Sequence, residues 1–423
     1  MTGITRRWAA ATLAASALVR PALGQPAPGQ RAGGPRELDE VLNRIVADGG
    51  APGVVAAAAT DKGPFYTGAA GKRNAAKGPE MTPDSVFWIA SMTKAVTSTA
   101  AMQLVEQGKL RLDALASEVL PDLLGAPQVL EGFDADGKPR LRPAKRPVTL
   151  RLLLTHTAGF AYDTWDAALG RYMKATGLPP IGTCRNDALR APLVFDPGER
   201  WEYGINIDFI GKMVEAVSGK RLGEYMRENI FAPLGMDDTS FRISPSQRAR
   251  LVSMHTRTAA GGFQPIDFEM PQDPEFEMGG GGLYSTAPDY LRFAQAFLHG
   301  GELQGARILR PETVAEMSRN QIGDILVTKL ATQQPERSAD AEFFPGMPKK
   351  WGLGFMLNSA EAPTGRSADS LAWAGLGNTY FWIDPRKRIA GVILMQYLPF
   401  ADPKAIQALY AYETEVYKAT QST

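Results

Sequence analysis

The sequence predicts a mixed α/β (α+β) fold in which both ends of the chain contribute to one sheet and a mainly helical subdomain is inserted between them. Short β-rich runs occur near the start of the folded part, within 54–71, and again at 380–396. Between them, Leu110 to about Met236 is rich in helix formers and loops. Because no fixed-period repeat is visible, a single domain over 36–423 is the simplest organisation.

The first 24 residues have the layout of a signal peptide. Arg6 and Arg7 precede an apolar run from Trp8 to Val19, and small residues follow before position 25. Paired arginines directly before an apolar run also fit a twin-arginine export signal of a bacterium. We therefore expect a signal peptide at 1–24, a flexible Pro- and Gly-rich leader at 25–35, and a periplasmic or secreted mature protein.

The folded part is expected to begin with a helix and a β-hairpin. Apolar residues recur at helical spacing in 37–47, and the Gly- and Pro-containing stretch 49–53 ends this helix. The apolar runs 54–59 and 65–71 are then short strands. Asp61-Lys62-Gly63 supplies the turn between them.

Helices are expected again in the centre, and strands return near the C-terminus. Strong helix formers run from Ser91 to Gln107, where Gly108 ends the helix, and a second apolar stripe covers 207–217. The runs 380–384 and 389–396 are β-rich, and a helical stretch follows to Tyr417. These last strands would complete the sheet that the first hairpin begins.

Composition excludes several classes of function. The net charge of +1 and evenly mixed charges argue against nucleic acid or anionic lipid as a partner, and the mature chain has no run long enough to span a membrane. Cys184 is the only cysteine, so it is expected to be structural, with no disulfide or thiolate metal site. With three histidines and no His-Glu-x-x-His motif, no metal or cofactor is expected, and a small molecule is the expected partner.

A possible nucleophile and base occur together in Ser91-Met92-Thr93-Lys94. Three residues apart on a helix, the two side chains lie on one face, so the lysine amine can reach the serine oxygen. A lysine acts as a base near neutral pH only when it is partly desolvated or held near other cations or dipoles. By itself the pair also fits an ordinary surface helix.

Two further segments carry side chains suited to the same chemistry. Tyr203 follows a Pro-Gly turn and precedes the helix at 207–217, and beside a lysine its phenol could serve as general base and acid, although a packed aromatic is the simpler interpretation. Trp373-Ala374-Gly375-Leu376 stands just before the strand at 380–384. Small residues at such an edge allow a substrate to pair with the backbone.

Together and in this order, the three segments resemble the serine β-lactamase and penicillin-binding-protein superfamily, whose pattern is S-x-x-K, then Y-x-N, then K-T-G. Leu152–Phe160 and Gly280–Thr286 are similar to stretches in its class C-like members. The resemblance covers most of the mature chain. It implies an antiparallel sheet flanked by helices, an inserted helical subdomain and a cleft between them.

The resemblance also implies roles for individual residues. Ser91 would be the nucleophile, Lys94 and Tyr203 the proton-transfer pair, and the backbone N–H groups of Ser91 and Leu376 the oxyanion hole. Substrate would be bound by Trp373, Ala374, Gly375 and Asn206. His156 is expected to be a hydrogen-bonded structural residue, His255 and His299 to occupy surface or loop positions, and residues 259–278 to border the cleft.

Two departures from the pattern point to the substrate. Ile205 stands where Y-x-N has its Asn, and Asn206 follows one place later; Trp373 stands where K-T-G has its Lys. Tryptophan cannot supply the charge that attracts the carboxylate of a β-lactam or a peptide. The third motif instead resembles that of family VIII carboxylesterases, so we expect carboxylic ester hydrolysis through an acyl-enzyme. β-Lactamase or D-amino-acid peptidase activity, and a non-catalytic binding protein, are the alternatives.

Overall fold

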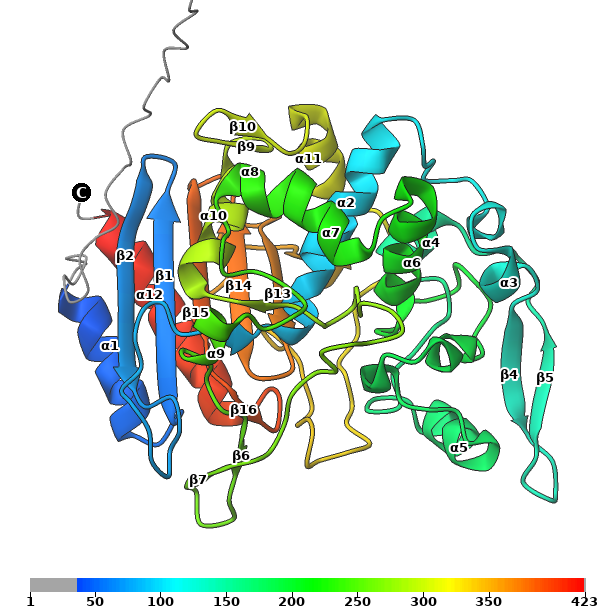
Figure 1. The fold of residues 1–423 in the computed structure, drawn as a ribbon, viewed down its shortest axis with the longest axis horizontal. Coiled ribbons are helices and arrows are strands. Elements are labelled where there is room, and N and C mark those ends of the chain that lie inside the picture. Colours follow the sequence, from blue (N-terminus) through cyan, green and yellow to red (C-terminus); the bar gives the residue numbers. More distant parts are fainter. Residues whose placement is uncertain (1–35, 422–423) are drawn as a thin grey trace, which may run out of the picture. The chain divides into compact units, whose positions relative to one another are not determined.

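The computed structural model describes residues 36–421, so the predicted signal peptide (1–24) and leader (25–35) lie outside the described residues. The described part is organised around a seven-stranded sheet (Figure 1). Its strands are β1 Gly53–Thr60, β2 Gly63–Gly71, β11 Lys349–Trp351, β12 Met356–Asn358, β13 Leu371–Gly375, β14 Thr379–Asp384 and β15 Ile389–Leu394. They follow the order β11-β12-β13-β14-β15-β1-β2, and every neighbouring pair is antiparallel.

Strands from the N-terminal and C-terminal parts of the described chain lie side by side in this sheet. β1 pairs with β2 on one side and with β15 on the other, with Val55 opposite Leu394. β1 is buried along almost its whole length, as expected for a strand covered on both faces. The prediction of one sheet built from both chain ends is confirmed.

Helices and shorter strands complete the described residues. The longer helices are α1 Arg36–Ala47, α2 Thr93–Glu106, α5 Ala167–Thr176, α6 Asn206–Ser218, α10 Ala287–Leu298 and α12 Pro403–Gln421. The shorter ones are α3 Pro121–Leu124, α4 Leu150–Leu154, α7 Leu222–Met226, α8 Ala232–Leu234, α9 Pro245–Arg248 and α11 Pro311–Met317. Small sheets join β3 Phe87–Trp88 with β8 Tyr284–Ser285, β4 Gln128–Phe133 with β5 Pro139–Pro143, β9 Glu302–Leu303 with β10 Ala306–Arg307, and β16 Tyr397–Leu398 with β6 His255–Arg257 and β7 Phe263–Pro265.

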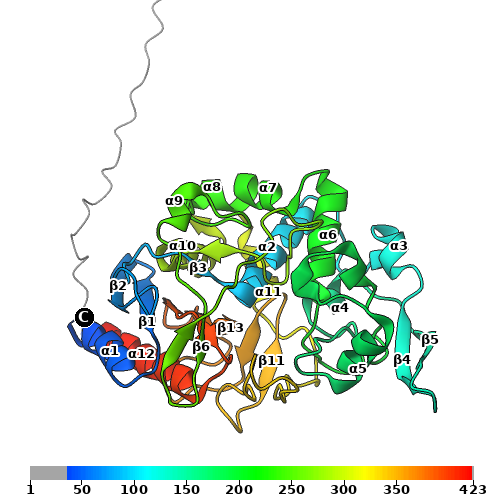
Figure 2. The same cartoon turned by 60° about the horizontal axis from the view of Figure 1, so that its bottom comes forward.

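Two consecutive residues of β14 show how the sheet is covered. Side chains alternate between faces along a strand, so Phe381 and Trp382 point to opposite sides. Trp382 packs against Tyr412 of α12, whereas Phe381 packs against Tyr290 of α10. α12 and its neighbour α1 therefore cover one face, and α10 covers the other (Figures 1 and 2). Trp373 is paired with Phe381 in the ladder and faces the α10 side.

The inserted subdomain is mainly helical but also contains a hairpin that the sequence reasoning did not anticipate. β4 and β5 pair antiparallel, and their turn is closed by Asp134, whose carboxylate accepts the N–H groups of Asp136 and Lys138. Both views place this hairpin at the end of the subdomain away from the sheet (Figures 1 and 2). Within residues 36–421, no helix combines the length and apolarity that crossing a membrane requires.

The remaining expectations for single residues have mixed outcomes. Cys184 is buried, as predicted for a structural thiol, and His299 is exposed at the end of α10. The surface or loop position predicted for His255 is wrong. Its ring is fully buried in β6, where one nitrogen accepts the Ala75 N–H and the other donates to the Gln396 carbonyl oxygen.

Candidate active site

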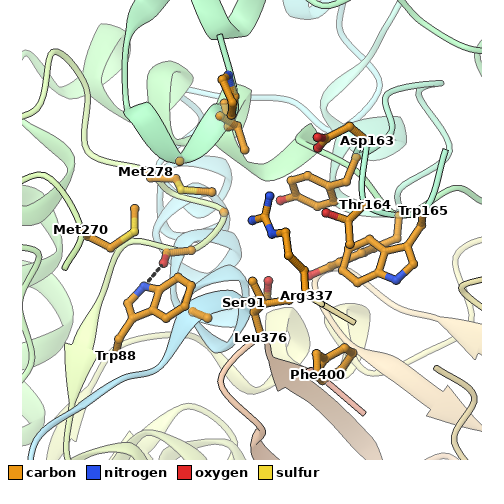
Figure 3. A pocket seen from close by; sticks show the side chains of 18 of the residues that line it. Trp88, Ser91, Asp163, Thr164, Trp165, Met270, Met278, Arg337, Leu376 and Phe400 are labelled. Carbon is orange, nitrogen blue, oxygen red and sulfur yellow. Dashed lines mark hydrogen bonds between the residues drawn. The ribbon is translucent and has the colours of Figure 1, made fainter. Parts of the chain in front are cut away.

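A cavity of about 270 Å³ opens beside the N-terminal end of α2, and Ser91 and Leu376 line it (Figure 3). Tyr203 also belongs to its lining. Its wall comes from the sheet, the inserted subdomain and the connections between them. Most of the lining side chains are apolar or aromatic: Trp88, Tyr162, Trp165, Ile181, Phe268, Met270, Met278, Trp373 and Phe400. Such a surface suits a largely apolar organic substrate, with few polar groups to orient it.

Ser91 is presented on a tight turn at the start of α2. A 3₁₀ turn, Ala90–Met92, leads directly into the α-helix. Ala90 has a positive φ of 44°, a conformation that is uncommon for residues other than glycine and that clusters at functional sites. Ser91 remains partly accessible, while nearly every other residue of this helix is buried.

Lys94 reaches Ser91 from the first turn of α2. Its Nζ lies 3.1 Å from Ser91 Oγ, 3.0 Å from Tyr162 Oη and 2.6 Å from the carbonyl oxygen of Gly280. A neutral amine has two N–H groups, which would serve the tyrosine and the carbonyl oxygen, and one lone pair, which is left for the serine hydroxyl. The contacts therefore suit an amine that accepts the Ser91 proton.

Burial shifts Lys94 toward this neutral form. The side chain is fully buried, and desolvation lowers its pKa to about 7. The opposing influence is the buried carboxylate of Asp208 on α6, which favours the charged lysine. Gly280 connects the two groups, because its N–H donates to Asp208 Oδ1 at 2.8 Å while its carbonyl oxygen accepts from Lys94.

The lack of a side chain at Gly280 leaves room for the Asp208 carboxylate in this contact. A Cβ at this position would lie 2.5 Å from Asp208 Oδ2. Thr97 of α2 holds the same segment by donating to the carbonyl oxygen of Gly279 at 2.7 Å. The Gly-rich stretch 280–286 stands out in the sequence, whereas Asp208 was not predicted; its sequence signal is an acidic residue within an otherwise apolar helical stripe.

Tyr203 is the second predicted proton-transfer group, and it lies against both Ser91 and Trp373. Trp373 Nε1 donates to Tyr203 Oη at 3.0 Å, and the neighbouring Ser91 hydroxyl acts to lower the pKa of the same phenol. Lys94 Nζ lies 4.7 Å from the centre of the Tyr203 ring. Burial raises the pKa of Tyr203 above its usual value, so the phenol is protonated near neutral pH.

A second tyrosine, Tyr162, completes the group and was not predicted. Its phenol accepts from Lys94, and its ring lies 5.2 Å from that of Tyr203. The two segments approach closely because Gly204 follows Tyr203: a Cβ there would lie 2.2 Å from the carbonyl oxygen of Phe160. Burial keeps the pKa of Tyr162 well above its usual value.

The predicted oxyanion-hole residues lie where two elements touch. A Cβ at Gly375 would lie 2.3 Å from the carbonyl oxygen of Ile89, so this glycine lets the end of β13 pack against the turn that carries Ser91. Both Ser91 and Leu376 line the cavity. Among the turn, loop and cap hydrogen bonds of residues 36–421, none uses the N–H of either residue, in keeping with two donors that face the cavity.

The structure brings some predicted substrate-binding residues to the cavity and not others. Trp373 and Ala374 line it, and Phe268, Met270 and Met278 place the 259–278 segment at its edge as expected. Asn206 does not line the cavity. Its buried amide contacts His156 Nδ1 at 3.0 Å and the Phe160 carbonyl oxygen, so the predicted contact with substrate has no support in this geometry.

His156 has the structural role that was expected. It is fully buried, and its Nδ1 also accepts the Gly204 N–H over a long 3.5 Å contact. Burial and the nearby Lys94 lower its pKa well below the usual value, so the ring is neutral. Within the described part of the chain, no cluster of three or more His, Cys, Asp or Glu residues could hold a metal ion.

The fold and site agree with comparisons to known proteins. The sequence profile of the family described as Beta-lactamase matches residues 38–414. This chain belongs to the beta-lactamase family. The family assignment confirms the resemblance that the three sequence motifs indicated. It also confirms the predicted fold class.

Among its relatives in the family, the described activities concern acyl groups. Acyltransferase mokF of Monascus pilosus is 33% identical over 365 residues, which cover 82% of this chain and 87% of mokF. Lovastatin esterase of Penicillium rubens is 31% identical over 375 residues, which cover 85% and 92%. The unliganded structure of simvastatin synthase (LovD) from Aspergillus terreus superposes with a TM-score of 0.79 and 29% identity, covering 91% of this chain and 98% of that one.

Proposed function

We propose that this protein is a serine hydrolase that cleaves carboxylic esters through an acyl-enzyme on Ser91. The observation that carries the proposal is the contact of Lys94 Nζ with Ser91 Oγ, made by a fully buried amine whose pKa lies near neutrality. The apolar cavity and the acyltransferase and esterase relatives support the substrate class.

In the acylation step, neutral Lys94 takes the Ser91 proton as the serine oxygen bonds to the ester carbonyl carbon. The carbonyl oxygen becomes an oxyanion, and the N–H groups of Ser91 and Leu376 stabilise it. When the ester C–O bond breaks, the alcohol leaves with a proton from the Lys94–Tyr203 pair. The Trp373 hydrogen bond keeps the Tyr203 phenol oriented toward the reacting oxygen.

The acyl-enzyme is then resolved by the same groups in reverse. Neutral Lys94 takes a proton from a water molecule, whose oxygen attacks the acyl carbon, and Ser91 regains its proton as the carboxylic acid leaves. An alcohol in place of water would transfer the acyl group instead. The acyltransferase relatives make transfer a natural second outcome of the same intermediate.

Cleavage of β-lactams or D-amino-acid peptides is the second candidate because the Ser91–Lys94 arrangement would serve it equally. Trp373 weighs against this activity, because it stands in the third motif and its indole carries no positive charge that could pair with a substrate carboxylate. A non-catalytic binding role is disfavoured by the complete set of Ser91, Lys94 and Tyr203. The signal-like residues 1–24 support placing the mature protein in the periplasm or outside the cell.

The proposal is tested with the purified mature protein on p-nitrophenyl butyrate and on a chromogenic cephalosporin. We expect ester turnover well above cephalosporin turnover, and a loss of at least about 10³-fold in the Ser91→Ala variant. Ser98→Ala is the matched control. Its hydroxyl is also buried on α2 but has no hydrogen-bond partner among the residues that the structure describes, so its removal should leave turnover intact.

Either of two results would overturn the proposal. Full ester turnover by Ser91→Ala would remove this serine from the mechanism, and dominant cephalosporin cleavage would favour the β-lactamase alternative.

A further inference from the structure

Among the described residues that line the active-site cavity, one has a cationic side chain, in a wall that is mostly apolar or aromatic. Arg337 lines the cavity, and Figure 3 shows its guanidinium pointing toward the middle of the lining side chains. Among the described residues, its side chain makes a single long hydrogen bond, 3.4 Å from Nη1 to Gln334 Oε1, and no ion pair. A guanidinium has five N–H donors, so most of them remain available to a bound molecule.

The two acidic residues that also line the cavity have other partners. Glu269 forms a two-pronged ion pair with Arg248, with distances of 2.8 and 2.9 Å. Asp163 accepts the Gln334 amide at 2.9 Å. The Gln334 side chain therefore stands between Arg337 and Asp163, contacting one with its oxygen and the other with its nitrogen.

The backbone around Arg337 is held firmly against the cavity wall. Its own N–H donates to the Gln334 carbonyl oxygen, and its carbonyl oxygen accepts the Phe400 N–H at 2.9 Å. Ser338 accepts from Trp165 Nε1, and the Gln333 N–H donates to the Thr164 carbonyl oxygen. The segment is thus fixed on both sides while the guanidinium extends from it.

We propose that Arg337 binds a carboxylate of the substrate, so that the enzyme prefers esters or acyl acceptors carrying an acid group besides the reacting ester. A guanidinium can hold a carboxylate through two parallel hydrogen bonds, which are strong in an apolar cavity. This inference rests on the proposed function for the reaction that the bound substrate undergoes. The claim that Arg337 binds a carboxylate can be tested without that reaction. The cation comes from a segment distant from the third motif, where Trp373 provides none.

Binding is measured first, without turnover, in the Ser91→Ala background. The cavity is lined by Trp88, Trp165 and Trp373, so a molecule that binds in it should change the protein's fluorescence. The probes are phenylalkanoic acids of increasing chain length, each compared with its neutral amide. A pH of about 8.5 keeps Lys94, with its pKa of about 7, mostly neutral and leaves Arg337 charged.

We expect the best acid to bind about tenfold or more tightly than its amide. Adding Arg337→Gln to the Ser91→Ala protein should abolish the preference for the acid over the amide. Arg337→Lys should retain part of this preference. Arg319→Gln is the matched control, since Arg319 is exposed, pairs with Glu316 and does not line the cavity. Equal binding of acid and amide, no binding of any acid at millimolar concentration, or an unchanged preference in Arg337→Gln would overturn the inference.

Turnover then separates this inference from the proposed function. The kcat/KM of mono-p-nitrophenyl glutarate relative to p-nitrophenyl butyrate should fall about tenfold in Arg337→Gln, mainly through KM. If neither ester is turned over but the acid preference depends on Arg337, the proposed function fails and the carboxylate site stands. If Ser91-dependent turnover is found without any acid preference in binding, only the carboxylate site fails.

Discussion

Replacing Asp208 with Asn should shift the pH dependence of the reaction toward acid. Asp208 is buried and bonded to Gly280, whose carbonyl oxygen accepts from Lys94. Its negative charge favours the protonated lysine and so opposes the pKa-lowering effect of burial. Asparagine has the same shape and still accepts the Gly280 N–H, so the substitution removes the charge and keeps the contact.

The size of the shift follows from the geometry. Both groups hydrogen-bond to Gly280, one to its carbonyl oxygen and the other to its N–H. As an order-of-magnitude estimate, two unit charges about 7 Å apart at an effective dielectric constant of about 20 interact by about 2 kcal/mol, or about 1.5 pK units. Without the carboxylate, the pKa of Lys94 falls further below about 7, and the neutral amine persists to lower pH. The acidic limb of the kcat/KM profile should therefore move to lower pH by one to two units, as an order-of-magnitude estimate.

The assay is the pH profile of kcat/KM for p-nitrophenyl butyrate, corrected for the ionisation of p-nitrophenol. Asp289→Asn is the control, since Asp289 is another buried carboxylate, is bonded to Thr239 and the Asp238 N–H, does not line the cavity, and should leave the limb in place. An acidic limb that stays in place or moves to higher pH in Asp208→Asn would refute Lys94 as the base.

Three further substitutions test other parts of the structure. Trp373→Phe removes the indole donor to the Tyr203 phenol and should cost about 1 kcal/mol, or about fivefold in kcat/KM; an unchanged rate would contradict a role for this hydrogen bond. Gly375→Ala should lower kcat by about 10²-fold with folding largely retained by circular dichroism, because its Cβ would lie 2.3 Å from a carbonyl oxygen of the nucleophile turn. Glu413→Gln leaves the Arg366 guanidinium buried without a counter-ion, and urea unfolding should show a loss of about 3–5 kcal/mol; a loss below about 1 kcal/mol would refute this estimate.

Local sequence patterns predicted the contacts that depend on one turn of helix or one hairpin. Ser91 and Lys94 are three residues apart on one helical face, so their contact does not depend on how distant segments pack together. The hairpin β1–β2 follows from apolar runs around a short turn. The β4–β5 hairpin was missed although Asp136-Gly137 is a turn signal, because the surrounding segment was interpreted as helical.

Contacts between distant segments were predicted only where the family motif supplied them. Tyr162 contacts Lys94, and Asp208 acts on it through its charge, from separate elements of the subdomain. Nothing in its local sequence distinguishes Tyr162 from a core residue, and Asp208 stands out only as an acidic residue in an apolar helical stripe. Arg337 reaches the cavity from a loop with no regular pattern. Asn206 illustrates the reverse: its position beside the motif invited a substrate-binding role, but as the first residue of α6 it points to His156.

The central claim is a covalent acyl group on Ser91, and trapping it is the most direct test. The protein is mixed with p-nitrophenyl butyrate, quenched in acid within the burst phase and analysed by intact mass and peptide mapping. We predict a mass increase of one butyryl group on the peptide that contains Ser91, present in the Ser98→Ala control and absent from Ser91→Ala. Turnover with no acyl adduct on this peptide under any quench time, or an adduct on another residue, would contradict the account.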